Sequence, residues 1–164
     1  MAGPRRPLGQ PRDHRIPFRL RPAVPDDADE IAAVFTASFR LLDFLPLLHT
    51  PDEDRWFIAN VILRHCAVTV AEDASGIVGF LARSGGEVRL LHIRPDRIGC
   101  GAGTQLIEAV KASGTEALEL WCFQQNARAR RFYEARGFRA IRFTDGADNE
   151  ERTPDIRYRW DAPS

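Results

Sequence analysis

The sequence lacks the features that mark disulfide-rich and metal-binding proteins. Its 164 residues include three cysteines, Cys66, Cys100 and Cys122, without the paired spacing that zinc or iron–sulfur ligation requires. We therefore expect free thiols, with no disulfide framework and no metal site. Lysine is nearly absent as well, because Lys111 is the single lysine among many arginines. We attribute this to compositional bias rather than to chemistry.

The sequence also has no excess of either charge and no long apolar run. Its 23 basic and 23 acidic residues balance, so no overall field attracts nucleic acid or an anionic membrane. No apolar segment approaches the length of a membrane span, and the N-terminus lacks the apolar core of a signal peptide. With 44% hydrophobic and 28% charged residues, we expect an ordinary cytoplasmic domain without nucleic-acid or membrane partners.

The chain divides into an N-terminal tail and one domain. Residues 1–17 contain four prolines, several arginines and few large apolar groups, which predicts a mobile tail. This tail is either a basic docking arm or a solvated start of the chain. Residues 18–164 form the predicted domain.

Apolar periodicity and turn residues predict a mixed α/β order for the domain. The predicted strands cover residues 18–21, 67–71, 77–82, 88–93, 117–123, 139–143 and 156–160. Helices are predicted from Asp26 through Phe39, from residue 51 or 52 to about 63, after residue 101, and over 127–136. The strands from 67 to 93 form an antiparallel meander, and strand–helix alternation follows it.

The most informative segment is the glycine turn, defined as residues 99–104 (Gly-Cys-Gly-Ala-Gly-Thr). It lies between the predicted strand 88–93 and a periodic helix. Its three glycines leave the backbone N–H groups without shielding β-carbons, and the helix turns its positive dipole end to the same place. This arrangement predicts an anion site, best suited to a diphosphate. The turn alone fits a dinucleotide, a nucleotide, coenzyme A or no ligand.

The pattern of a second segment, residues 126–138, predicts a capped helix. Asn126 is a favourable N-cap, and Gly137 suits the residue after the helix end, with Phe138 packing back. Phe132 and Tyr133 lie on the helix face that includes Ala129. Taken alone, this helical spacing predicts that both aromatic residues belong to the core.

Together the two segments resemble the Gcn5-related N-acetyltransferase (GNAT) family. The resemblance rests on the pattern Asn126-x-x-Ala129-x-x-x-Tyr133-x-x-x-Gly137-Phe138, which lies some two dozen residues beyond the glycine turn. It extends over most of the chain, from about residue 18 to 160. It implies a central, twisted, mostly antiparallel sheet flanked by about four helices. It also implies transfer of an acetyl group from acetyl-CoA to a primary amine of a small molecule or peptide.

The same resemblance implies positions for the acetyl-CoA site. The diphosphate would bind main-chain N–H groups of the glycine turn, namely Gly99, Cys100, Gly101, Ala102, Gly103 and Thr104. The main chain at Leu91 and Ile93 would pair with the pantetheine arm, Asn126 would contact the cofactor, and Tyr133 would lie near the sulfur as the catalytic residue. Ile98 and Cys100 depart from the polar and cationic residues common in the family, with Arg97 as a substitute charge.

The acceptor side is less defined by the sequence. We expect Phe39, His49 and Glu151 to bind the amine substrate. An acidic cluster over residues 145–155 would attract a cation, or it is simply a solvated loop. Candidates for the base that deprotonates the amine are His92, Glu72 and Glu87. His92 is equally well interpreted as a packed histidine. The protein is expected to be a monomer or a homodimer.

The sequence is compatible with two other interpretations. A Rossmann-type dinucleotide site fits Gly99-x-Gly101 and Glu119, but Thr104 replaces the third glycine, and three antiparallel strands precede the turn. A non-catalytic CoA-binding sensor or regulatory module on the same fold is the alternative from another functional class. Tyr133 favours the enzyme over that module.

Overall fold

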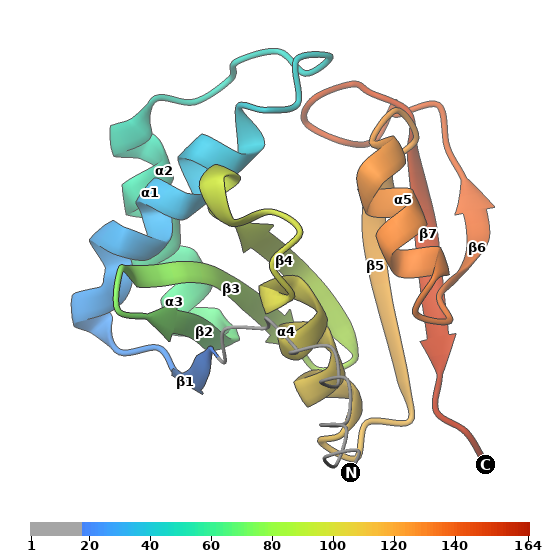
Figure 1. Cartoon of the computed structure of the whole chain (residues 1–164). Coiled ribbons are helices and arrows are strands. Elements are labelled where there is room, and N and C mark those ends of the chain that lie inside the picture. The colour runs from blue at the N-terminus through green and yellow to red at the C-terminus, as the bar shows by residue number, and fades with distance from the viewer. Residues whose placement is uncertain (1–17) are drawn as a thin grey trace, which may run out of the picture.

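The structure is a computed structural model that describes residues 18–164, so the expected tail 1–17 lies outside it. The domain is built on one seven-stranded sheet in the order β1-β2-β3-β4-β5-β7-β6 (Figure 1). Its strands are β1 (Arg19–Pro22), β2 (Ala67–Asp73), β3 (Gly76–Ser84), β4 (Glu87–Ile93), β5 (Ala117–Phe123), β6 (Arg139–Phe143) and β7 (Asp155–Asp161). Among the strands of residues 18–164, β4 and β5 are the one parallel pair, which confirms the mixed, mostly antiparallel sheet.

Four helical segments flank the sheet, as expected. They are α1 (Ala28–Phe39) after the short η1 (Pro25–Asp27); the continuous run α2 (Pro51–Phe57), η2 (Ile58–Ile62) and α3 (Leu63–His65); α4 (Ala102–Lys111) after η3 (Pro95–Arg97); and α5 (Ala127–Glu134). A capping box starts α2: Thr50 Oγ1 accepts from Glu53 N at 3.2 Å, and Glu53 Oε1 accepts from Thr50 N at 3.2 Å. The π-helical turn η2 was not predicted.

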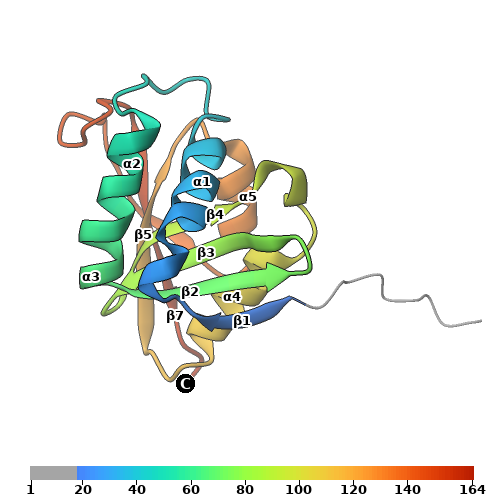
Figure 2. The same cartoon turned by 90° about the vertical axis from the view of Figure 1, so that its left-hand side faces the viewer.

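The sheet separates two hydrophobic cores. Ile31 of α1 and Ile58 of η2 pack with Phe80 of β3 in one core, on the side of α1 and α2. Leu106 of α4 packs with Leu118 of β5 in the other, on the side of α4 and α5. Figure 2 is viewed from the side of the sheet on which α1 and α2 lie. Strand β3 is therefore buried on both faces.

Strands β4 and β5 part soon after they meet. Their only register pair is Glu87 with Glu119, and the two strands diverge beyond it (Figure 1). On its other edge, β4 stays paired with β3 as far as Ile93, and Arg94 N donates to Val78 O at 2.7 Å. Because successive residues turn their main-chain groups to opposite edges, Leu91 and Ile93 direct theirs away from β3 and toward β5.

The β6–β7 loop, residues 144–154, is held by buried polar contacts. Asp155 is 8% exposed and accepts hydrogen bonds from Thr144 Oγ1 and from Asn149 Nδ2, the latter at 3.1 Å. The expectation that Asp155 belongs to a solvent-facing acidic cluster is therefore wrong, because its carboxylate is used inside the loop. Gly146 lies in the same loop with φ 84°.

Gly146→Ala should destabilise the protein more than Gly114→Ala. Both glycines are left-handed, at φ 84° and 87°, so alanine meets the same backbone penalty of about 1–2 kcal/mol at each. A β-carbon at Gly114 meets open space, whereas one at Gly146 overlaps the main chain of Thr153. Thermal unfolding followed by circular dichroism should give a melting temperature several degrees lower for Gly146→Ala, at about 2–4 °C per kcal/mol. Equal melting temperatures would contradict the described loop.

Candidate active site

The glycine turn forms an open helix start. Gly99 and Gly101 have φ values of 83° and 97°. Their chain neighbours aside, no atom of residues 18–164 lies within 4 Å of the position that a β-carbon would take. The first main-chain hydrogen bond of α4 runs from Gln105 N to Gly101 O at 3.0 Å. The N–H groups of residues 102–104 precede that bond and have no helical acceptor. They lie at the positive end of the α4 dipole, which suits an anion.

Helix α5 fixes the first turn of α4. Gly103 allows close packing here, since a β-carbon at this position would lie 3.4 Å from the Phe132 ring. The Arg136 guanidinium stacks 3.8 Å from the centre of that ring, donates to Phe132 O at 2.8 Å and donates to Thr104 Oγ1. The hydroxyl oxygen of Thr104 is therefore an acceptor for Arg136, which fixes this side chain against α5.

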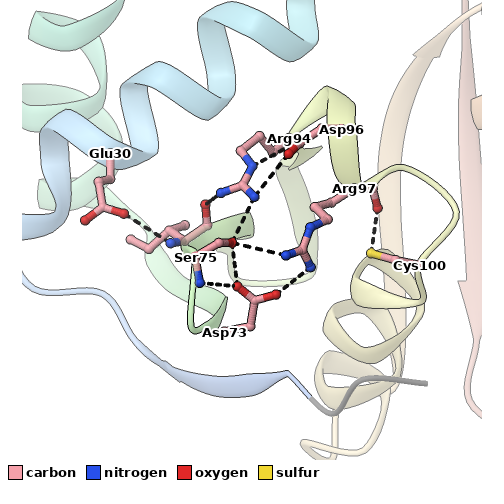
Figure 3. Close-up of polar contacts among 8 residues, drawn as sticks. Glu30, Asp73, Ser75, Arg94, Asp96, Arg97 and Cys100 are labelled. Carbon is pink, nitrogen blue, oxygen red and sulfur yellow. Dashed lines mark hydrogen bonds and ion pairs between the residues drawn. The ribbon is translucent and has the colours of Figure 1, made fainter. Parts of the chain in front are cut away.

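Arg97 anchors the glycine turn to the β2–β3 hairpin (Figure 3). Its guanidinium donates to Asp73 at 2.5 Å and to Ser75 Oγ at 3.3 Å, and Arg94 donates to the same Ser75 oxygen at 2.9 Å. Hydrogen bonds from Ser75, with a smaller contribution from Arg97, lower the pKa of Asp73 to about 2. The Cys100 thiol donates to Arg97 O at 2.6 Å. The charge of Arg97, expected to face the diphosphate, is thus already paired with Asp73.

Helix α5 presents Tyr133 with a packed ring and an unbonded hydroxyl. Asn126 caps the helix as expected, since its Oδ1 accepts from Ala129 N at 3.2 Å. The Tyr133 ring is 9% exposed and lies 5.5 Å from the Phe138 ring, so it is a core aromatic. Within residues 18–164 its hydroxyl makes no hydrogen bond. Burial raises the pKa of Tyr133 well above its usual value, so the phenol stays protonated.

The three residues expected to bind the acceptor lie around one cavity. Phe39, His49 and Glu151 line a space of about 500 Å³ between α1, the α1–α2 loop, α2 and the β6–β7 loop. His49 joins two of these elements: its Nε2 lies 2.6 Å from Glu150 Oε1 and its Nδ1 lies 3.4 Å from Glu53 Oε2. We call the side chains of His49, Glu53 and Glu150 the His49 clasp. The hydrogen bond with Glu53, followed by that with Glu150, raises the pKa of His49.

Several cavity residues were not identified from the sequence. Leu47 and Leu48 directly precede His49 in a loop, and Trp56 is 63% exposed on α2. These large apolar side chains do not follow the spacing of core residues in a helix or strand. That departure is the sequence feature that could have identified them as cavity residues. Leu90 of β4 also lines the cavity and connects it to the strand edge at Leu91.

The candidate bases are already engaged elsewhere. The His92 ring packs edge-on against Phe35 at 5.1 Å, and its Nδ1 lies 3.0 Å from Ser38 Oγ. Burial lowers the pKa of His92 to about 4, so it is neutral near pH 7. Two arginines bind the remaining candidates: Arg21 binds Glu72 at 3.0 Å, and Arg157 binds Glu87 at 2.9 Å.

Similar proteins point to one family. The model of the acetyltransferase (GNAT) domain family matches residues 64–140. Mycothiol acetyltransferase of Propionibacterium freudenreichii is 30% identical over 157 residues, which cover 82% of this chain and 48% of that protein. The solution structure of apo YjaB from Escherichia coli superposes with a TM-score of 0.73 at 25% identity, covering 88% of this chain and 98% of YjaB.

A more distant structure shares the fold alone. It is YncA of Salmonella typhimurium, described as a putative acetyltransferase with its cofactor acetyl-CoA, with a TM-score of 0.69, 16% identity and coverage of 90% and 95%. The family model and the shared fold identify a GNAT acetyltransferase domain over residues 64–140 of this chain. The chain spans about half the length of the mycothiol acetyltransferase. Within residues 18–164, no helix is both long and apolar enough to cross a membrane.

Raising the pH should loosen the His49 clasp. Because the folded-state pKa of His49 is raised, the stability it contributes is complete below the ordinary value of about 6.5 and is lost as the pH rises through the folded-state pKa. An NMR titration of the His49 ring should give a pKa above 6.5. Glu150→Gln should move it back toward 6.5.

The matched control for this titration is Glu151→Gln, in the neighbouring residue. Glu151 lines the same cavity, but within residues 18–164 its carboxylate makes no bond to His49. This variant should change the titration of His49 less than Glu150→Gln does. Equal shifts from the two variants would show that the 2.6 Å contact is not the cause.

Proposed function

We propose that this protein transfers the acetyl group of acetyl-CoA to a primary amine of a small molecule or peptide, by direct attack on the thioester. The observation that carries the proposal is the continuity of the free β4 edge with the open glycine turn. An extended pantetheine arm pairs with the first, and a diphosphate binds the second. The Salmonella protein of the same fold, described with acetyl-CoA, supports this assignment.

The donor site would use main-chain groups more than side chains. The N–H groups of Gly99, Gly101, Ala102, Gly103 and Thr104 would donate to the diphosphate oxygens. The N–H of Cys100 donates to Arg97 O at 3.3 Å, so it would join them only by exchanging that bond. Leu91 and Ile93 would pair with the pantetheine amides through their outward main-chain groups. Asn126 would contact the cofactor from the start of α5. Arg97 would join the diphosphate only by exchanging its bond with Asp73.

Main-chain groups of β4 would also serve the chemical step. Acetyl-CoA supplies the activated acyl group. Attack by the amine places negative charge on the thioester oxygen, and an outward N–H at Leu91 or Ile93 would stabilise it. Such a donor is worth about 3–4 kcal/mol.

The attacking amine must be neutral. Near pH 7 only about four parts in ten thousand of an alkylamine with a pKa of about 10.4 are unprotonated. With a pKa of about 4, His92 is a poor acceptor for that proton. We therefore propose that the proton leaves through water.

Tyr133 would stabilise the leaving thiolate by a hydrogen bond. In free solution, proton transfer from a phenol of pKa about 10 to a thiolate of pKa about 8.5 is uphill by about 2 kcal/mol. Burial raises the pKa of Tyr133 further, which makes early transfer less favourable still. The hydroxyl would donate to sulfur first and pass on its proton only when the attacking ammonium supplies another.

Tyr133→Phe should lower kcat by about 100-fold or more while the Kd for acetyl-CoA stays within about twofold. The reason is that only the hydroxyl at the sulfur is removed, and the ring keeps its packing. Calorimetry with acetyl-CoA measures the affinity, and release of free thiol with a panel of amines measures kcat. The matched control is Tyr158→Phe, because the Tyr158 hydroxyl is bound to Glu134 at 2.7 Å and faces no proposed substrate.

Two outcomes of this experiment count against the proposal. Unchanged kcat in Tyr133→Phe removes Tyr133 from the mechanism. Tight binding of acetyl-CoA without turnover on any amine favours a non-catalytic CoA-binding sensor or regulatory module on the same fold.

A further inference from the structure

The cavity near His49 has an aromatic interior and an apolar rim. The inner wall consists of Phe35, Phe39 and Phe57. The ring centre of Phe35 lies 5.7 Å from that of Phe39 and 6.0 Å from that of Phe57. Leu47 and Trp56 stand at the rim, 73% and 63% exposed. Large apolar groups left in water gain free energy when a ligand covers them. A cavity of about 500 Å³ is within the range of small-molecule sites.

The charges around this cavity are mainly negative. Its lining includes four carboxylates against Arg40 and His49, so the sum stays negative whether or not His49 is protonated. Three of the carboxylates are engaged: Asp54 by Thr36 Oγ1 at 2.7 Å, and Glu53 and Glu150 by His49. Within residues 18–164, Glu151 has no side-chain partner. It is therefore the carboxylate available to a cationic ligand.

We infer that the acceptor is a primary amine carried on a bulky apolar group without a carboxylate, such as an aralkylamine or a long alkylamine. This rests on the proposed function. The aromatic wall takes the apolar body, and Glu151 attracts the ammonium group. Leu90 places the cavity beside the β4 edge where the acyl group would lie.

Two common kinds of amine fit this cavity poorly. An α-amino acid brings its own carboxylate into negative surroundings, where like charges repel. A diamine brings a second ammonium group to the apolar wall, where attraction to the aromatic faces offsets only part of its lost hydration. The cavity therefore favours ligands that carry a positive charge, and among these it favours ligands that carry only one.

The test compares matched amines with the wild-type protein. 2-Phenylethylamine and phenylalanine differ by one carboxylate, and hexylamine and 1,6-diaminohexane differ by one ammonium group. In each pair the first amine should have the higher kcat/KM, by about 10- to 200-fold. Equal or reversed preference within the pairs would overturn the inference.

Two variants test the assigned residues. Glu151→Gln should raise the KM for 2-phenylethylamine several-fold and narrow its advantage over phenylalanine. Trp56→Ala should raise the KM for both apolar monoamines. Neither change should alter the KM for acetyl-CoA. The matched controls, Glu116→Gln and Trp121→Ala, change exposed residues that do not line the cavity, and they should leave all these values unchanged.

Calorimetry without acetyl-CoA separates this inference from the proposed function. Wild-type protein should bind 2-phenylethylamine, and Glu151→Gln should bind it several-fold more weakly. If the protein binds this amine as expected but never acetylates any amine, the transfer proposal fails and the ligand class stands. If it acetylates polar amines and neither binds nor acetylates 2-phenylethylamine, the ligand class fails and the transfer proposal stands.

Discussion

The divergence of β4 from β5 is the constraint on which the rest of the site depends. A strand inside a sheet normally satisfies its main-chain groups on both edges, but β4 does so on only one edge beyond Glu87. Within residues 18–164, the outward main-chain groups of Leu91 and Ile93 have no strand partner, and we propose that the ligand pairs with them like an added strand. Pro95 then turns the chain into η3, and the glycine turn places the start of α4 beyond the end of that strand. One extended ligand can therefore follow the strand edge to the helix N-terminus.

The two sides of the sheet contribute different parts of the proposed reaction. Helices α4 and α5 provide the glycine turn and Tyr133, while α1, α2 and the β6–β7 loop surround the cavity. Strand β4 belongs to both, because Leu90 lines the cavity and Leu91 directs its main chain to the open edge. The His49 clasp holds the β6–β7 loop against α2, so the shape of the cavity depends on a contact between segments far apart in sequence.

Local signals explain why much of the fold was predictable. The cap by Asn126 and the boundaries of β5 and β6 follow from neighbouring residues, and all are seen. The clasp joins residues 101 positions apart, and Arg97 meets Asp73 24 positions away, so no local pattern encodes either contact. The π-helical turn η2 likewise has no signal in its apolar sequence.

The most direct test of the central claim is a titration of ¹⁵N-labelled protein with coenzyme A, followed by amide NMR. The account predicts that the largest shifts fall on the amides of residues 101–104 and on those of Leu91 and Ile93. Binding of coenzyme A that leaves these amides unchanged and shifts a different surface would contradict it.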